Sequence, residues 1–175
     1  MKKFFDKKRK NKGFSLVELI VVVAIMAVLM AVLVPTLVSN VEKSRQQKDK
    51  TAIAELRHAI VNALADEACL DATKGAGSTA DTNGNVAIKG LFGTETDAGN
   101  KAIIDKVTAT IGDSKITLTS KYKSAKLELV NFVPTDGIVV LQVTVTGNSS
   151  LDFYIDSVGQ HTGKLSTSTA APGTT

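Results

Sequence analysis

The 175-residue chain has little cysteine, few aromatic residues and, beyond its first residues, no excess of positive charge. Its single cysteine, Cys69, allows no disulfide within the chain, which excludes a small secreted scaffold held by disulfides. It has no tryptophan, six phenylalanines and two tyrosines. So few rings argue against a stacking surface for single-stranded nucleic acid.

Positive charge is concentrated in residues 1–13, which contain seven basic residues and one acidic residue. The rest of the chain has 14 basic and 16 acidic residues, so the net charge of +4 comes from this basic block. A nucleic-acid-binding domain needs cations spread over a folded face. We therefore expect no direct binding to nucleic acid.

A long apolar run follows the basic block. Between residues 14 and 38 only four residues are not apolar: Ser15, Glu18, Pro35 and Thr36. A helix over these 25 residues is about 37 Å long, enough to cross a hydrocarbon core about 30 Å thick. We expect residues 14–38 to span a membrane once, with the basic block on the cytoplasmic side and the rest of the chain outside.

Two ordinary interpretations of this N-terminus leave features unexplained. A secretory signal peptide has a shorter apolar region and a small-residue cleavage site, and residues 39–43 form no such site. A plain membrane anchor leaves Glu18 without a reason, because a carboxylate in hydrocarbon costs roughly 2.5 kcal/mol or more. Under that interpretation Glu18 extends toward the lipid headgroups.

Gly13, Phe14 and Glu18, at this spacing before a long apolar helix, resemble the type III signal of type IV pilins and pseudopilins. The resemblance covers about the first 55 residues. It implies that a prepilin peptidase removes residues 1–13 as a leader by cutting after Gly13, and then methylates the new N-terminal Phe14. The mature chain would have 162 residues, with Glu18 as the fifth.

The resemblance also implies a mode of assembly. Phe14 and Glu18 are four residues apart and share one helix face. A staggered neighbouring subunit can set the ammonium of its Phe14 against this Glu18, neutralising both charges in an apolar filament core and fixing the register.

Pro35 is the other special residue of the run. Inside a helix it removes a backbone hydrogen bond and clashes with the carbonyl four residues earlier, which predicts a kink near residues 31–35. The pilin family commonly has a proline here, and many members have a glycine eight residues before it. This chain has Ala27 at that position, a strong helix former.

Residues 39–68 continue the helical pattern but are amphipathic. Ile53, Leu56, Ile60 and Leu64 recur at helical spacing. We therefore expect one helix from about residue 14 to residue 68, whose second half packs its apolar stripe on a sheet.

The sequence predicts a globular head over residues 69–165. It begins with a variable loop at residues 71–100, followed by a short helix that ends at Gly112. Alternating apolar residues then predict an antiparallel sheet within residues 115–158. Residues 166–175, rich in serine, threonine and alanine, are expected to be a flexible tail.

Four strands are expected in that sheet, joined as a meander: residues 116–122, 126–133, 139–145 and 151–155. A turn at residues 134–137 connects the middle pair. The predicted fold class is α+β. A long N-terminal helix, apolar in its first half and amphipathic in its second, packs on a roughly four-stranded antiparallel sheet.

No motif predicts catalysis, a cofactor or a metal. Residues 75–80 match a glycine-rich dinucleotide pattern, but a helix precedes them where that motif needs a strand. Residues 81–85 resemble the start of a calcium loop, yet Phe92 stands where its glutamate belongs. His58 and His161 have no spacing suited to a metal. We therefore expect no enzyme.

The leading interpretation is a structural pilin. It would be held in the cytoplasmic membrane with its N-terminus inside, and then assembled with copies of itself into an extracellular pilus for adhesion, twitching motility or biofilm formation. The implied partners are the prepilin peptidase, the assembly platform and minor pilins. Because it has a single cysteine, the chain resembles the pilins of Gram-positive bacteria in this trait. The alternatives are a pseudopilin of a type II secretion or DNA-uptake system, and a membrane-anchored ligand-binding module.

Overall fold

The structure is a computed structural model that describes residues 13–73, 77–93, 97–133, 137–145 and 152–163. The chain forms two compact units, residues 1–41 and residues 42–175. Residues 1–12 of the expected leader, the expected tail and most of the expected turn at residues 134–137 lie outside the described residues.

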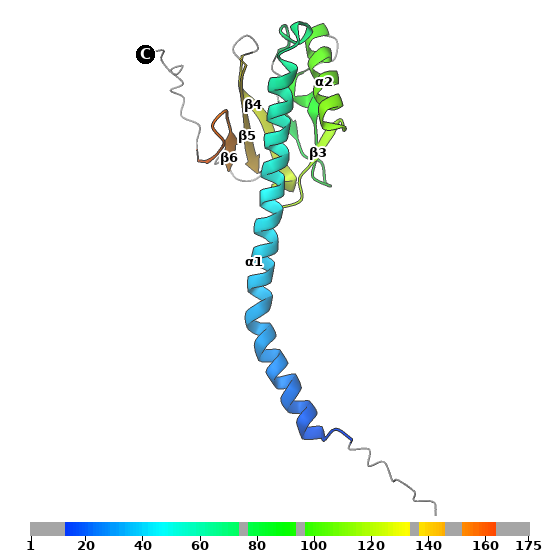
Figure 1. Cartoon of the computed structure of the whole chain (residues 1–175), viewed down its shortest axis with the longest axis vertical. Coiled ribbons are helices and arrows are strands. Elements are labelled where there is room, and N and C mark those ends of the chain that lie inside the picture. The colour runs from blue at the N-terminus through cyan, green and yellow to red at the C-terminus, as the bar shows by residue number, and fades with distance from the viewer. Residues whose placement is uncertain (1–12, 74–76, 94–96, 134–136, 146–151, 164–175) are drawn as a thin grey trace, which may run out of the picture. The chain divides into compact units, whose positions relative to one another are not determined.

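One helix, α1, runs from Leu16–Ala63 and contributes to both units (Figure 1). The prediction of a single long helix is confirmed, although α1 ends five residues before the expected residue 68. A short 3-10 helix, η1 (Glu67–Cys69), follows it. Asp66 caps η1 by accepting a hydrogen bond from the amide of Ala68, so the chain starts a new turn here instead of extending α1.

The second unit is built around a five-stranded antiparallel sheet in the order β1-β4-β5-β6-β7. Its strands are β1 (Ser78–Thr79), β4 (Ala125–Val133), β5 (Ile138–Val145), β6 (Phe153–Ile155) and β7 (Gln160–Thr162). Residues Ile53, Leu56 and Ile60 of α1 are fully buried in the same core as Leu127, Leu141 and other sheet residues. The predicted α+β class, with the amphipathic half of the helix packed on an antiparallel sheet, is confirmed.

The sheet contains a four-stranded meander, but not the one expected. Residues 116–122 do not form its first strand, because β3 (Lys115–Thr117) pairs with β2 (Asn85–Ala87) in a separate two-stranded sheet. Tyr122 lies in a 3-10 helix, η3 (Lys121–Ser124), and is still buried. The unpredicted β7 takes the fourth place in the meander.

The segment expected as a loop at residues 71–100 has structure of its own. It holds β1, β2, the 3-10 helix η2 (Ile88–Leu91) and the start of α2 (Ala98–Ile111). Asp97 caps α2 by accepting hydrogen bonds from the amides of Gly99 and Asn100. The predicted end at Gly112 is confirmed, with a left-handed φ of 81° that suits glycine. Figure 1 shows α2 beside the second half of α1.

Candidate functional site

The first described residues before α1 have no regular secondary structure and are open to solvent. Gly13, Phe14 and Ser15 precede the first helical residue, and the side chain of Phe14 is 83% exposed. A Cβ built on Gly13 would meet nothing within 4 Å, and its φ is not positive. Packing against the described residues therefore does not require glycine at position 13. If glycine is required there, the requirement is imposed by a molecule that binds this segment.

Glu18 closes the first turn of α1. Its Oε2 accepts a hydrogen bond of 2.9 Å from the amide of Ser15, and the carbonyl of Ser15 accepts one from the amide of Leu19. Ser15 is thus the N-cap and Glu18 the third helical residue, half of a capping box. The sequence analysis missed this role, although the spacing of serine and glutamate is the signal for it.

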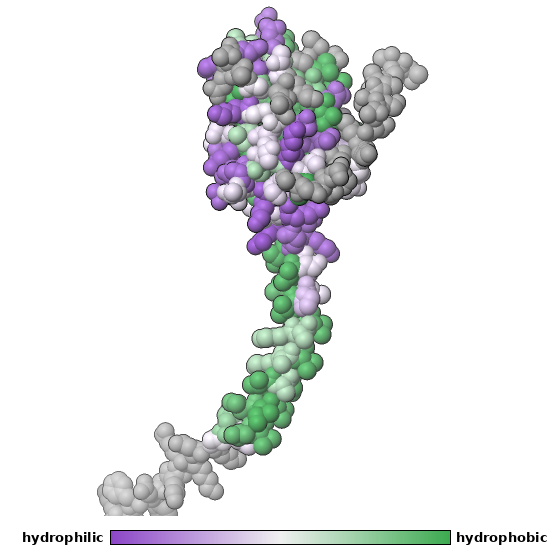
Figure 2. Space-filling view, turned by 180° about the vertical axis from the view of Figure 1, so that it is seen from behind, coloured by the Kyte–Doolittle hydropathy of each residue, from purple (hydrophilic) through white to green (hydrophobic). Residues whose placement is uncertain are grey.

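An apolar surface covers α1 on all sides in the first unit. Every described residue from 13 to 41 is exposed, including Leu19, Val28 and Leu33. Figure 2 colours this segment hydrophobic on the face that it shows. Among the described residues, α1 is the one helix that is long and apolar enough to cross a membrane. These side chains need an apolar environment that the described residues of the subunit do not supply.

Pro35 lies within α1, which continues through it. Its missing amide leaves the carbonyl of Ala31 without the usual helical donor. The hydroxyl of Thr36 donates to the carbonyls of Val32 and Leu33, each at 2.9 Å, and so adds bonds to the same turn. The kink remains a prediction.

A buried carboxylate fixes the second half of α1 to the head. Asp49 is 1% exposed and accepts four hydrogen bonds, from the amides and the hydroxyls of Thr119 and Ser120. Ser120 also caps η3. Asp49 precedes Ile53 by four positions and so belongs to the same, buried face of the helix.

Two further side chains extend this attachment. Glu42 accepts a hydrogen bond of 2.9 Å from the amide of Lys121, and this bond, with a second from Gln46, holds the pKa of Glu42 below its usual value. Arg57 is 6% exposed and donates from Nε to the carbonyl of Val139 at 2.9 Å.

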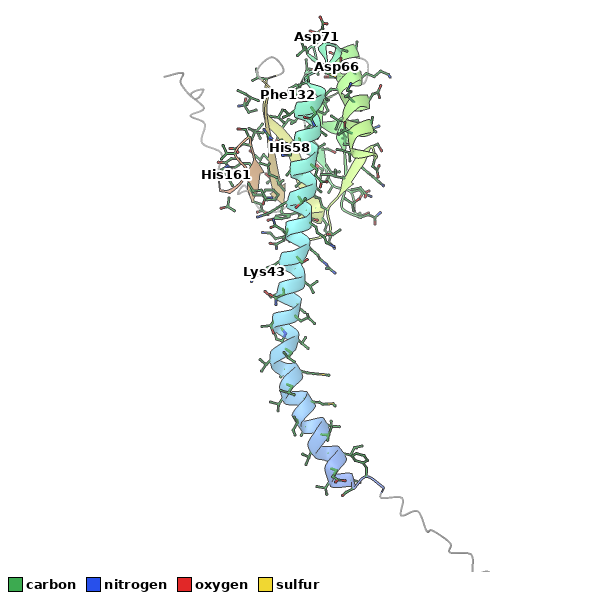
Figure 3. The ribbon with its side chains drawn as sticks, in the orientation of Figure 1. Lys43, His58, Asp66, Asp71, Phe132 and His161 are labelled. Carbon is green, nitrogen blue, oxygen red and sulfur yellow. The ribbon has the colours of Figure 1, made fainter. Side chains whose placement is uncertain are left out.

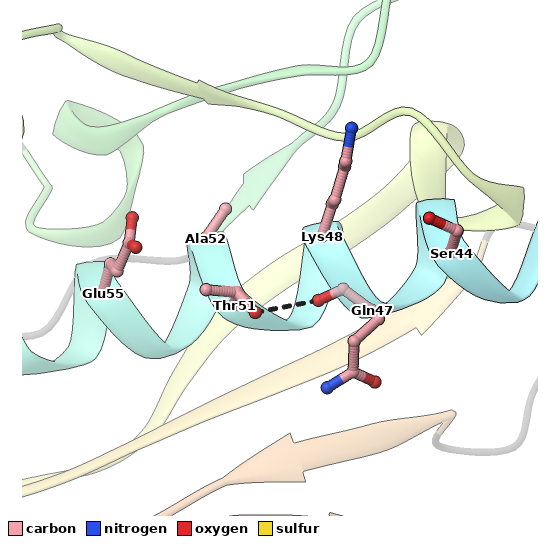
Figure 4. A pocket seen from close by; sticks show the side chains of 6 residues that line it. All are labelled: Ser44, Gln47, Lys48, Thr51, Ala52 and Glu55. Atoms are coloured by element: carbon pink, nitrogen blue, oxygen red, sulfur yellow. Dashed lines mark hydrogen bonds between the residues drawn. The ribbon is translucent and has the colours of Figure 1, made fainter.

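A shallow hollow lies along the outer face of the same helix (Figure 4). Its lining residues follow helical spacing: Ser44, Gln47, Lys48, Thr51, Ala52 and Glu55. The hydroxyl of Thr51 donates to the carbonyl of Gln47, as the dashed line in Figure 4 shows. The hollow is open and holds no nucleophile paired with a base.

The weaker candidates of the sequence have ordinary structural roles. The carboxylate of Asp81 accepts hydrogen bonds from the amides of Asn83 and Asn85 and from the side chain of Asn85, which makes a turn. Figure 3 places His58 on α1 and His161 on β7, well apart. Within the described parts of the chain, no group of three potential ligands could hold a metal.

Comparison with known proteins supports the N-terminal interpretation. Residues 8–34 match the family described as the prokaryotic N-terminal methylation motif. The chain is 46% identical over 54 residues to type II secretion system core protein G of Vibrio cholerae, which covers 31% of this chain and 37% of that protein. It is 41% identical over 53 residues to the core protein G of Aeromonas hydrophila, covering 30% of this chain and 37% of that protein.

A third relative is matched over a longer stretch of this chain. Prepilin peptidase-dependent protein A of Clostridium perfringens is 32% identical over 85 residues, 49% of this chain and 60% of that protein. The chain thus matches less than two thirds of the length of each of these relatives. No solved structure matches it significantly. Over the residues that these comparisons match, the chain is therefore similar to proteins of the type IV pilin-like family.

Proposed function

We propose that the chain is a structural subunit of a type IV pilus, polymerised through the first half of α1 into an extracellular filament for adhesion, motility or biofilm formation. The observation that carries the proposal is the exposure of every described residue from 13 to 41 in a segment that is almost wholly apolar. Lipid covers this surface before assembly, and neighbouring copies of α1 cover it in the filament.

Processing prepares the subunit for that change. Prepilin peptidase cuts after Gly13, which removes the basic leader, and methylates the amine of Phe14. The exposed residues before α1, which have no regular secondary structure, support this step, because a peptidase can reach them and an added Cβ on Gly13 would meet no described atom within 4 Å.

Assembly uses Glu18 and Phe14. In the single subunit the carboxylate of Glu18 is held by the amide of Ser15, so it has a partner within the membrane. In the filament the ammonium of a neighbouring Phe14 provides the opposite charge, which adds a register to otherwise non-directional apolar packing. The assembly platform and minor pilins are the further partners of this process.

A pseudopilin of a type II secretion or DNA-uptake system is the second candidate. The names of two relatives, each a type II secretion system core protein G, favour it. A membrane-anchored ligand-binding module, the third alternative, has less support, because the hollow on α1 is open and lined mostly by polar side chains.

The first experiment determines the intact mass and the N-terminal residue of the protein taken from its native cell. We expect a chain that begins at N-methylated Phe14. A chain that still begins at Met1, or one cut after the apolar run, would overturn the proposal.

Variants and electron microscopy then separate the candidates. We expect Glu18→Ala to deplete the filaments, whereas the control Glu55→Ala, on the exposed side of the second half of α1, preserves them. Long surface fibres that label for this chain support the pilus. Loss of protein secretion or DNA uptake without such fibres supports the pseudopilin.

A further inference from the structure

We propose that a basic collar at the start of the second unit, defined as Lys43, Arg45, Lys121 and Lys123, binds the phosphate groups of anionic phospholipids on the outer face of the cytoplasmic membrane. The inference rests on the proposed function, which places residues 14–38 in that membrane and the second unit outside it. It adds a specific lipid partner to that function.

The fold brings the two halves of the collar together. Lys43 and Arg45 belong to α1, whereas Lys121 and Lys123 lie about 80 residues later in η3. The hydrogen bond from the amide of Lys121 to Glu42 places η3 directly beside this part of the helix. The bonds of Asp49 to the two residues before η3 hold the segment there.

Acidic residues near the collar are already used in the fold. Asp49 is buried and accepts four hydrogen bonds, and Glu42, which also lies near Arg45, accepts the amide of Lys121. The side chain of Asp152 is 8% exposed and lies 3.5 Å from Nζ of Lys121. Its carboxylate therefore offers little surface to an approaching ligand.

The cations themselves stay available. Lys43, Arg45 and Lys123 are exposed, and within the described residues no salt bridge joins them to an acid. The side chain of Lys121 is 53% exposed despite its contact with Asp152. An exposed lysine or arginine with an extended stem can reach a headgroup phosphate while its backbone stays in place.

The position of these cations in the chain needs a reason. Basic residues just beyond the exported end of a span work against the orientation that the leader sets, because cations favour the cytoplasmic side. Once the leader is removed, residues 41–50 are the basic flank of the span. Attraction between these cations and anionic headgroups would offset their unfavourable effect on the orientation of the span.

Charge and distance favour lipid over nucleic acid as the partner. The collar begins five residues after Val38, which in a helix is about 7 Å along the axis and suits a headgroup layer beside the span. The chain after Gly13 carries 14 basic and 16 acidic residues, too balanced for an extended polyanion.

The test uses the processed full-length protein in zwitterionic detergent micelles. Native mass spectrometry measures its affinity for added phosphatidylglycerol and for added phosphatidylcholine. One basic side chain contributes roughly a fivefold factor at an anionic surface, so we expect phosphatidylglycerol to bind at least about fivefold more tightly. The double variant Arg45→Gln/Lys123→Gln, which leaves Lys43 and Lys121 in place, should reduce this preference at least about fivefold.

A matched control variant removes the same number of positive charges at positions outside the collar. Lys89→Gln/Lys115→Gln changes two exposed lysines of other elements and should retain the preference. Equal affinity for the two lipids, or an equal loss in both double variants, would overturn the inference. Tighter binding of a 20-nucleotide single-stranded DNA than of phosphatidylglycerol would also overturn it and assign the collar to nucleic acid.

The same spectra keep this outcome separate from that of the proposed function. A chain of the mature mass that binds both lipids equally contradicts the collar alone. A chain that keeps its leader in the native cell contradicts the proposed processing, whatever its lipid affinities.

Discussion

The two halves of α1 share one secondary structure and differ in what covers them. Residues 13–41 are exposed although most of them are apolar, whereas Ile53, Leu56 and Ile60 of the second half are fully buried. Among the described residues, the sheet covers the second half of the helix, and none covers the first half. Both halves therefore form helix, but only the second half is buried by the described residues of the subunit itself.

Polar residues follow the same division. In the first half, Glu18 is bound by the nearby amide of Ser15. In the second half, Asp49 is bound by residues 70 and 71 positions away. Local partners leave a segment free to change its surroundings, while distant partners fix it in one fold.

Truncating a leucine in each half should sharpen this contrast most. Leu56→Ala removes a fully buried side chain and should lower the free energy of unfolding of the head by about 3–4 kcal/mol. Leu29→Ala, at a side chain that is 56% exposed, should leave that free energy unchanged. Urea unfolding in mild detergent, followed by tyrosine fluorescence, measures both. Equal destabilisation by the two variants would show that the first half is part of the head's cooperative unit.

Removing the buried carboxylate should have the next largest effect. Asp49→Ala leaves the amides of Thr119 and of the buried Ser120 without their acceptor, and we expect a loss of about 2–3 kcal/mol. The control Asp105→Ala breaks an exposed ion pair with Lys101 and should cost less than about 0.5 kcal/mol. The same unfolding assay applies. A loss as small for Asp49 as for Asp105 would mean that water replaces its hydrogen bonds.

Substitutions of two glycines test whether glycine is required at each position by the backbone conformation or by a binding partner. At Gly84 the φ is 83° and an added Cβ would lie 2.1 Å from the carbonyl oxygen of Leu118, so Gly84→Ala should cost about 2 kcal/mol. Gly13→Ala should leave the free energy of unfolding unchanged, because an added Cβ there meets no described atom within 4 Å. It should block cleavage, because we propose that the peptidase requires glycine at this position. Thermal unfolding and intact mass are the two measurements. Normal cleavage of Gly13→Ala would contradict the role assigned to this glycine.

The smallest of these effects on stability is expected from acid, which should loosen the turn between β6 and β7. Burial raises the pKa of Asp156, but hydrogen bonds from the amides of Val158 and Gly159 and from His161 outweigh it, so the pKa lies below its ordinary value of 3.8. A lowered pKa in the folded state adds stability that is fully present above pH 3.8 and is lost as the pH falls through the folded-state pKa.

The expected change is at most about 1 kcal/mol, since the carboxylate is partly exposed. The measurement is the amide NMR shifts of Val158 and Gly159 between pH 6 and pH 2. We expect these amides to respond to acid before residues of β4 do, and the Asp156→Asn variant to show no such step. A simultaneous response of β4 would show global unfolding instead.

Much of the fold could be predicted from patterns that a segment carries by itself. The apolar run and the stripe from Ile53 onward predict α1, and Gly112 predicts the end of α2. Alternation predicts β4 and β5, whose residues Val139, Leu141 and Val143 line the core as expected. Each of these signals depends on residues within a few positions of one another.

The errors arose where distant contacts decide. Residues 116–122 alternate like a strand. However, Thr119 and Ser120 donate hydrogen bonds to Asp49, and the chain continues as η3 instead of as a strand. The segment of residues 71–100 lacks a strong pattern, yet Ile88 and Phe92 are buried in the core. Short elements such as β1, of two residues, are stable only through their neighbours, so a local pattern gives little signal for them.

In the candidate site, the sequence identified Gly13, Phe14 and Glu18 by their spacing. It did not identify the hydrogen bond from Ser15 to Glu18, although that spacing was visible, nor the attachment through Asp49 and Arg57, which depends on the tertiary fold.

By itself, the sequence determined the long helix, its apolar first half and the methylation motif, because charge, hydrophobic length and helical spacing are properties of contiguous residues. The tertiary structure decided which strands form the sheet, and it decided that Asp49 of α1 meets Thr119 and Ser120 and that η3 lies beside α1. Those choices depend on burying apolar side chains while giving every buried polar group a partner. The partners lie about 70 residues apart, and only folding brings them together.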